Sequence, residues 1–379
     1  MRFEFATATR IVFGEGAAAT LPELVRTFGT RPLVVTGAST ERAAWLVSAL
    51  SAEVFAVPGE PTVDLAREGA RRVQDSACNV IVSLGGGSAI DAGKAIAAVA
   101  TNGGEPLEFL DVVGKGRAIV VPPLPFIAVP TTAGTGSEVT RNAVLGSTEH
   151  GIKVSLRSPL MLPQAALVDP ELTYGLPPAV TAATGLDALT QLIEPYVSAH
   201  ANPLVDAICV EGIGRITGAL RRVYHNGADR EARREMALAS LFGGLALANA
   251  GLGVVHGLAA PLGGSWKAPH GALCAALLSH GMAANVAALR ERAPQHPALE
   301  RYTDIARMLT GRNEASAADG IDWVRALCIE LNVPPLRAWG ITEADLPGVV
   351  EKAARASSMQ ANPLPLTGEE LFLVVTAAR

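Results

Sequence analysis

The chain has 379 residues, which is long enough for two domains with a hydrophobic core each. Apolar residues make up 49% of it and charged residues 18%, which excludes an intrinsically disordered chain. The formal net charge of −5 gives no basic surface of the kind that nucleic-acid binding requires, so we expect no nucleic-acid partner.

The cysteines and the apolar segments indicate the compartment. The four cysteines, Cys78, Cys209, Cys274 and Cys328, show no Cys-x-x-Cys spacing, so we expect buried thiols in a reducing compartment. The first sixteen residues predict a strand and a turn rather than a secretory leader. Residues 236–266 lack charged side chains, but seven glycines, an asparagine and a histidine favour a buried helix pair over a membrane span. We therefore expect a cytoplasmic protein without a membrane partner.

The first half of the chain alternates strands and helices. Short apolar runs predict strands at 31–36, 53–57, 79–84 and 126–130. Helical patterns lie between them at 44–50, 63–74 and 89–100. This alternation predicts parallel βαβ units, and such sheets bind ligands at the carboxyl ends of their strands.

After residue 176 the pattern becomes helical. Pro177 and Pro178 open a helical segment that we expect to end at about Glu194, before Pro195. Further helical stretches are predicted at 203–220, 230–250, 272–290, 298–310, 317–331 and 342–356. The fold class is therefore an α/β N-terminal domain with a parallel sheet, at 1–177, followed by an all-α C-terminal domain at 178–379.

Two loops follow predicted strands and are suited to nucleotide binding. The strand at 79–84 runs into Gly85, Gly86, Gly87 and Ser88, and a helix is expected from about Ala89. Glycines let the backbone approach a phosphate, and the free N–H groups of the helix then point at the anion. Ser88 and Asp91 also resemble a capping box, and the alternative is an ordinary glycine turn with a cap.

The second loop, Thr-Thr-Ala-Gly-Thr-Gly-Ser-Glu at 131–138, offers hydroxyl groups and unhindered backbone after the strand at 126–130. Two such loops in one parallel sheet indicate nucleotide binding more strongly than either loop would alone. Lys153 could supply a positive charge to a phosphate or ribose, or could equally be a solvated surface lysine.

Four residues of the second half form a possible metal site. Asp187 and Gln191 are four residues apart and would share one helix face, and His256 and His270 could complete the set. A carboxylate and two imidazoles suit iron(II), zinc or nickel, whereas a carboxamide oxygen is a weak ligand. An unpaired Asp187 in its apolar segment would be costly to bury, so it needs a cation or several donors. The set is either a modified metal centre or one that has lost its metal.

Five stretches resemble the iron-containing (group III) alcohol dehydrogenases. They are Gly-Gly-Gly-Ser-Ala-Ile-Asp-Ala-Gly-Lys at 85–94, Pro-Thr-Thr-Ala-Gly-Thr-Gly-Ser-Glu at 130–138, Leu-Val-Asp-Pro at 167–170, Gly-Leu-Asp-Ala-Leu at 185–189, and Gly-Val-Val-His-Gly at 253–257 taken with Pro-His-Gly at 269–271. The resemblance spans nearly the whole chain, and the motifs come in the family's order.

The resemblance implies a dehydroquinate synthase-like architecture, in which the active site lies in a cleft between a dinucleotide-binding domain and a helical domain. It implies a homodimer, an NAD(P) cofactor and a divalent metal, Fe²⁺ or Zn²⁺. The pyrophosphate would sit on Gly86, Gly87 and Ser88, and Gly37, Gly85 and Asp91 would also belong to the cofactor-binding set. Thr131, Thr132 and Thr135 would line the cofactor, and Lys153 would lie near its ribose. The metal ligands would be Asp187, the residue at the position of Gln191, His256 and His270.

Three positions depart from the family's pattern. Gln191 and Ala260 stand where members usually carry histidines, one a metal ligand and one a proton relay. Gly37, at the end of the first predicted βαβ strand, stands where NAD-preferring members often carry an aspartate. Without that carboxylate, Ser39, Thr40 and Arg42 could contact a 2′-phosphate, so NADP is expected to be at least tolerated.

The leading hypothesis is hydride transfer between an alcohol and NAD(P), with the metal polarising the oxygen of a small alcohol or carbonyl substrate. A second hypothesis is a maleylacetate reductase-type enzyme, a related branch that can work without bound metal. A third is a nucleotide-binding protein that has lost catalysis, which Gln191 and Ala260 motivate.

Overall fold

The protein consists of two compact units. Its computed structural model describes residues 2–110, 114–147, 152–266 and 268–379. The α/β unit contains Ala6–Thr132 and Gly136–Tyr174. The helical unit contains Gly175–Arg379 together with two short segments, Met1–Phe5 and Ala133–Thr135. The domain boundaries predicted from the sequence, 1–177 and 178–379, place these two short segments with the N-terminal domain.

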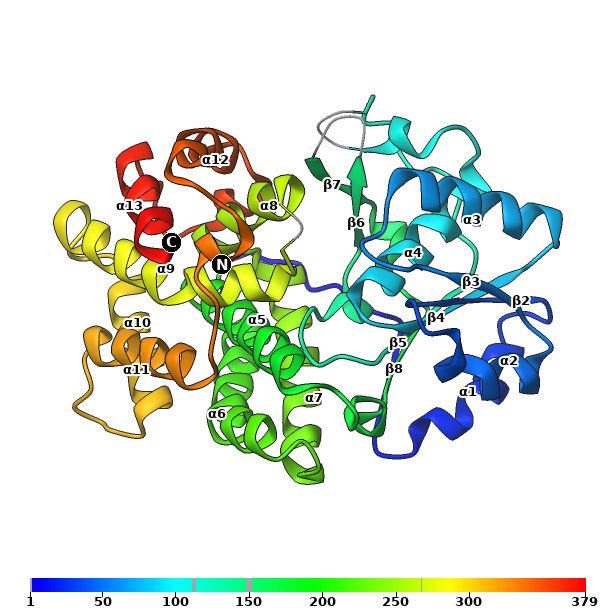
Figure 1. Cartoon of the computed structure of the whole chain (residues 1–379), viewed down its shortest axis with the longest axis horizontal. Helices are drawn as coiled ribbons and strands as arrows, with labels where there is room; N and C mark the ends of the chain where they lie inside the picture. The colour runs from blue at the N-terminus through cyan, green and yellow to red at the C-terminus, as the bar shows by residue number, and fades with distance from the viewer. Residues whose placement is uncertain (1, 111–113, 148–151, 267) are drawn as a thin grey trace. The chain divides into compact units, whose positions relative to one another are not determined.

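A six-stranded, fully parallel sheet forms the centre of the α/β unit (Figure 1). In spatial order it contains β1 (Arg10–Phe13), β8 (Ala165–Val168), β5 (Phe126–Pro130), β4 (Val80–Gly85), β2 (Pro32–Thr36) and β3 (Glu53–Ala56). The four strands predicted at 31–36, 53–57, 79–84 and 126–130 are therefore confirmed, and β8 was not predicted.

Helices cover both faces of this sheet, as the continuous apolar character of its strands requires. Because successive side chains of a strand point to opposite faces, Val34 of β2 packs toward α1 (Leu21–Arg26) and α2 (Ala44–Leu50). Its neighbours Leu33 and Val35 pack toward α3 (Val63–Asp75) and α4 (Gly87–Asn102) on the other face (Figure 1).

A two-stranded antiparallel hairpin, β6 (Asn142–Ser147) and β7 (Ile152–Arg157), lies outside the main sheet and was not predicted. The ammonium group of Lys94 on α4 holds its base by donating to the Thr140 hydroxyl and the Asn142 carbonyl, both at 2.8 Å. Lys94 is fully buried, and burial lowers its pKa to about 8.

The helical unit contains α5 (Pro178–Val197), α6 (Pro203–His225), α7 (Arg230–Ala250), α8 (Val254–Ser265), α9 (His270–Arg292), α10 (Ala298–Thr310), α11 (Ala317–Glu330), α12 (Leu346–Ala354) and α13 (Gly368–Ala378). Its described part contains no strand, which confirms the all-helical prediction. The end predicted for the first helix was wrong, because α5 continues through Pro195 to Val197. Proline there removes one helical hydrogen bond, and the buried side chains of Tyr196 and Val197 offset that loss.

The charge-poor stretch 236–266 forms the end of α7 and all of α8, and these two helices meet at an angle of 99°. The following helix, α9, is long and apolar enough to cross a membrane by length and composition. However, 72% of its most apolar window is buried inside the protein, which is typical of a core helix.

Candidate functional site

The carboxyl edge of the sheet brings the glycine loops of β2 and β4 together. From β2 the chain proceeds to β3 on one side and then to β4 on the other, so the strand order reverses between β2 and β4. Such a switch point is where open α/β sheets bind ligands. Gly37 follows β2, and a Cβ atom added to Gly85 would lie 3.3 Å from the Gly37 nitrogen and 2.6 Å from the Cβ of Ala89. Only glycine at position 85 therefore permits this close approach.

The second predicted loop lies beside the first. The Thr131 N–H donates to the Gly85 carbonyl at 2.9 Å, and a Cβ atom on Gly86 would lie 3.4 Å from the methyl group of Thr132. The helix α4 begins at Gly87, and its N-cap residue is Gly86, which has no side chain to cap the helix. The predicted capping box of Ser88 and Asp91 was wrong, because the helix begins two residues earlier than expected. Ser88 instead lies in the first turn, where the N–H groups are free to bind an anion.

Other predicted cofactor residues have protein partners. Asp91 accepts a hydrogen bond from the Val144 N–H at 3.0 Å and lies 3.7 Å from the Lys94 ammonium, so it helps to hold the hairpin. Lys153 on β7 forms an ion pair with Glu60 at 3.2 Å and is not a solvated surface lysine. Thr135 lies in the short segment that belongs to the helical unit.

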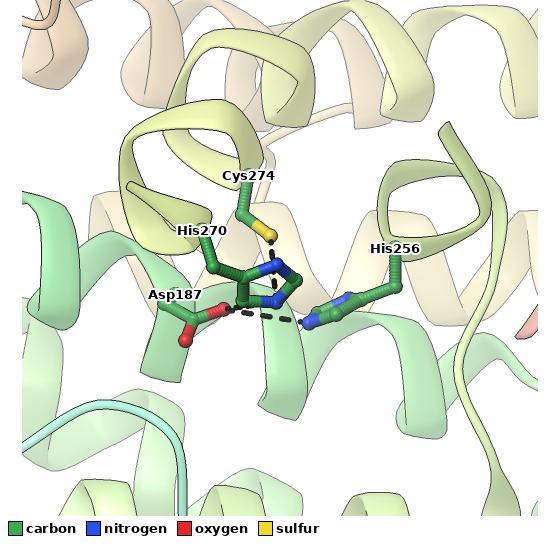
Figure 2. A group of neighbouring side chains, drawn as sticks. All are labelled: Asp187, His256, His270 and Cys274. Atoms are coloured by element: carbon green, nitrogen blue, oxygen red, sulfur yellow. Dashed lines mark hydrogen bonds and ion pairs between the residues drawn. The ribbon is translucent and has the colours of Figure 1, made fainter. Parts of the chain in front are cut away.

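Three predicted metal ligands lie together in the helical unit. Asp187 on α5, His256 on α8 and His270 on α9 gather with Cys274 on α9, and one ligand atom from each of the four lies within 4.8 Å of all the others (Figure 2). The Asp187 Oδ1 atom is 3.4 Å from His256 Nε2 and 3.8 Å from His270 Nε2. The His270 Nε2 atom is 3.5 Å from the Cys274 sulfur.

The helix start at His270 can approach α5 because the next residue is glycine. A Cβ atom on Gly271 would lie 2.5 Å from the Ala183 carbonyl oxygen and 3.4 Å from the Asp187 Cβ. The first turn of α9 therefore packs directly on the α5 backbone. This places His270, and Cys274 one turn later, against Asp187.

A second carboxylate orients His256. The Glu194 side chain is buried and lies 2.6 Å from His256 Nδ1 through one oxygen, while its other oxygen accepts the Val255 N–H at 2.7 Å. When Nδ1 of a histidine donates to a carboxylate, Nε2 is left unprotonated and can act as a ligand. In His256 that Nε2 atom faces Asp187.

Electrostatic interactions within the cluster shift three pKa values. The Asp187 pKa is lowered although burial opposes this, because the positive charge of His270 favours the carboxylate. Burial also opposes protonation of His256, but Cys274, Asp187 and Glu194 raise its pKa well above the ordinary value. Electrostatic interaction with Cys274, and then with Asp187, raises the pKa of His270 to about 8, although burial opposes this. The surroundings of the two imidazoles therefore favour positive charge at this site.

The unsatisfied atoms of the cluster fit a cation. Among the described residues, the buried Asp187 Oδ1, His256 Nε2 and Gln191 Oε1 atoms have no hydrogen-bond partner. Unpaired buried polar atoms are costly, and a divalent ion would satisfy the carboxylate and the imidazole together. Gln191 lies one turn after Asp187, with its side chain against α7, where a Cβ atom on Gly243 would be 3.2 Å from Gln191 Oε1.

Two residues of this site were not predicted from the sequence. Cys274 was expected only to be a buried thiol, and Glu194 was assigned no role. The signal for Cys274 was its position four residues after His270, which places both side chains on one helix face. Glu194 follows Asp187 by seven residues, which is two helical turns along the same face.

Family models match both halves of the chain, and both models describe the same family. Residues 8–170 match the family model described as iron-containing alcohol dehydrogenase, and residues 181–378 match the C-terminal model of the Fe-containing alcohol dehydrogenase family. The chain is 36% identical over 378 residues to alcohol dehydrogenase 4 of Schizosaccharomyces pombe, covering 97% of this chain and 87% of that protein.

Solved structures are similar over the whole length as well. A crystal structure of 1,3-propanediol oxidoreductase has a TM-score of 0.90 and 33% identity, covering 100% of both chains. Sulfoacetaldehyde reductase from Bifidobacterium kashiwanohense, solved in complex with NAD⁺, has a TM-score of 0.87 and 28% identity, covering 99% of this chain and 98% of that one. The chain therefore belongs to the iron-containing alcohol dehydrogenase family.

Proposed function

We propose that this protein is an NAD(P)-dependent, metal-dependent alcohol dehydrogenase whose metal centre is built on Asp187, His256 and His270. Its family membership makes it an oxidoreductase that interconverts alcohols and aldehydes. The observation that carries the proposed metal centre is the convergence of three helices on one buried carboxylate, with ligand atoms on Asp187 and His256 that have no hydrogen-bond partner. Gln191 is the fourth ligand expected from the sequence.

The cofactor is proposed to bind at the switch point of the sheet. The backbone of Gly85, Gly86, Gly87 and Ser88 at the start of α4 would hold the pyrophosphate, and Thr131, Thr132 and Thr135 would line the cofactor. Asp91 and Lys153 would support this site by holding the hairpin, through Val144 and Glu60. The bound NAD⁺ in the sulfoacetaldehyde reductase structure supports a nicotinamide cofactor for this chain.

Position 37 favours tolerance of NADP. A Cβ atom on Gly37 would meet nothing within 4 Å, so the end of β2 is open, and no carboxylate repels a 2′-phosphate there. The side chains of Ser39, Thr40 and Arg42 are exposed and follow directly. They could bind the 2′-phosphate.

A nicotinamide cofactor held at this site would supply the hydride acceptor for alcohol oxidation and, when reduced, the hydride donor for carbonyl reduction. A divalent metal held by the cluster would supply Lewis acidity toward the substrate oxygen. The Asp187 carboxylate would provide the negative charge that holds the cation, and Glu194, by accepting from Nδ1, would leave Nε2 of the neutral His256 imidazole free to bind it. Ala260 has no group that can relay a proton, so the proton released from the alcohol would leave through water or a ribose hydroxyl group.

The test is oxidation of NADPH and of NADH by the purified protein with a panel of short aldehydes, with and without divalent metal and after chelation. Metal-stimulated oxidation of a cofactor by at least one aldehyde is expected. No metal-stimulated oxidation with any carbonyl would overturn the proposal.

Two outcomes would identify the alternatives. Reduction of maleylacetate that survives chelation would indicate the maleylacetate reductase branch. Nucleotide binding without any turnover would indicate a chain that has lost catalysis. The proposal also places the protein in the cytoplasm as a homodimer, and sedimentation of the purified chain would test its oligomeric state.

A further inference from the structure

The Cys274 sulfur lies among atoms that can all bind a metal, and it is the only one of the four that was not expected. Cys274 is fully buried on α9, with its sulfur 3.5 Å from His270 Nε2 and within 4.8 Å of ligand atoms of Asp187 and His256. The other three cysteines belong to no such group in the described part of the chain. Among the described cysteines, Cys274 is therefore distinguished by its place beside three other potential metal ligands.

We propose that the Cys274 thiolate is the fourth protein ligand of the metal, so that the centre is an Asp-His-His-Cys site that selects zinc over iron. This inference rests on the proposed function only in assuming that Asp187, His256 and His270 bind a metal. It assigns the fourth position to a residue different from Gln191, and it names the class of ion.

Three of the six separations between ligand atoms in the cluster can be compared with tetrahedral coordination. With zinc bonds of about 2.0 Å to nitrogen or oxygen and about 2.3 Å to sulfur, a tetrahedron separates two nitrogen or oxygen ligands by about 3.3 Å, and nitrogen from sulfur by about 3.5 Å. The observed separations are 3.4 Å from Asp187 to His256 and 3.5 Å from Cys274 to His270. The 3.8 Å from Asp187 to His270 is slightly wider. A zinc ion could bind with small side-chain movements.

The helix geometry fixes the sulfur in place. His270 and Cys274 are four residues apart on α9, so they share one face of the helix and cannot separate without unwinding its first turn. Gly271 holds that turn against α5, beside Asp187. The Gln191 amide, in contrast, lies against Gly243 of α7.

The ligand chemistry determines which ion is favoured. A thiolate is a soft ligand that selects zinc, whereas an amide oxygen is hard and weak. Two anionic ligands, Asp187 and Cys274, would also balance the charge of a divalent ion. A neutral complex costs less to bury than a charged one.

The exposure of the cluster is compatible with a substrate oxygen as a fifth ligand. The side chains of Asp187 and His256 are almost fully buried, but that of His270 is 37% exposed. One side of the site is therefore open, and zinc in catalytic sites can expand to five-coordinate. Four protein ligands are thus compatible with catalysis.

The experiment is an anaerobic titration of the metal-free protein with Co²⁺, which reports coordination by sulfur independently of activity. A thiolate bound to Co²⁺ gives a strong charge-transfer band in the near ultraviolet, whereas oxygen and nitrogen ligands give only weak visible bands. The variants are Cys274→Ala, Gln191→Ala and Cys209→Ala. Cys209 is the matched control, because it is also fully buried in the helical unit but, among the described residues, belongs to no group of three or more potential metal ligands.

The parent protein, Cys209→Ala and Gln191→Ala are expected to show the charge-transfer band. Cys274→Ala should lose the band and bind Co²⁺ at least about ten- to hundredfold more weakly. Stoichiometric visible bands without the charge-transfer band in the parent protein would overturn the role of Cys274 and leave the proposed function standing. The band persisting in Cys274→Ala would also overturn it. If Co²⁺ bound to none of the proteins, both this inference and the proposed metal centre would be wrong.

Discussion

Replacing Glu194 by glutamine would test how the protein prepares His256 to bind a metal. In the native chain one carboxylate oxygen lies 2.6 Å from His256 Nδ1 and the other accepts the Val255 N–H at 2.7 Å. Glutamine has the same shape but offers one acceptor and one NH₂ donor. If its oxygen keeps Val255, its NH₂ group faces Nδ1, and His256 must move its own proton to Nε2. That proton would block the atom that faces Asp187.

If the amide is reversed, its oxygen accepts from Nδ1, and its NH₂ group then faces the buried Val255 N–H, which loses its acceptor. Either orientation removes one hydrogen bond to a charged group, which is worth about 1.5–3 kcal/mol. Since about 1.4 kcal/mol corresponds to a factor of ten, metal affinity should fall about ten- to hundredfold. Loss of a hydrogen-bond partner of a metal-binding histidine typically has an effect of this size.

The assay is competition for Zn²⁺ between the metal-free protein and a chromophoric chelator. Glu138→Gln is the matched control, because Glu138 is also buried but belongs to the α/β unit, and its replacement should leave metal affinity unchanged. Thermal unfolding of the metal-free variant would establish that it is folded. An affinity of Glu194→Gln equal to that of the parent protein would refute the role assigned to Glu194.

Three further predictions concern the cofactor, the packing and the pH dependence. Gly37→Asp should shift kcat/KM from NADPH toward NADH, because the added carboxylate has open space and would repel a 2′-phosphate; an unchanged ratio would contradict the proposed position of the ribose. Gly271→Ala should lower the free energy of unfolding by about 1–3 kcal/mol and weaken metal binding, because its Cβ would lie 2.5 Å from the Ala183 carbonyl oxygen. The control Gly218→Ala, where a Cβ meets nothing within 4 Å, should not lower stability in thermal melts, and equal melts of the two variants would argue against close packing at Gly271. The pKa of His270 is raised to about 8 in the folded protein, from about 6.5 in the unfolded chain. Protonation of His270 therefore stabilises the metal-free fold fully below pH 6.5, and this contribution is lost as the pH rises through 8. The Tm of the metal-free protein should therefore fall over this range while Zn²⁺ affinity rises, because the imidazoles must be unprotonated to bind; a Tm that rises with pH would show that another group dominates.

Sequence patterns predict correctly the elements whose signals are strong and local. The strands at 32–36, 80–85 and 126–130 are continuous apolar runs, which a parallel sheet covered on both faces requires. The long helices after Pro178 follow from apolar spacing and the absence of period-2 runs. The hairpin β6–β7 was missed because it contains glycine, serine and asparagine and obtains its stability from Lys94 and Asp91 on α4. Its contacts are distant in the sequence and leave no local pattern.

The candidate ligands Asp187, His256 and His270 could be selected from the sequence because charged and imidazole groups are conspicuous in apolar segments. The side chains that accompany them depend on how the helices pack in three dimensions. Cys274 and Glu194 gain their positions from the packing of α9 and α8 on α5, which depends on the space left at Gly271 and Gly253. The order of strands at the switch point, which brings Gly37 to Gly85, was likewise set by three-dimensional packing. Spacing along a chain fixes the face of a helix, but the partner of that face depends on contacts between segments far apart in sequence.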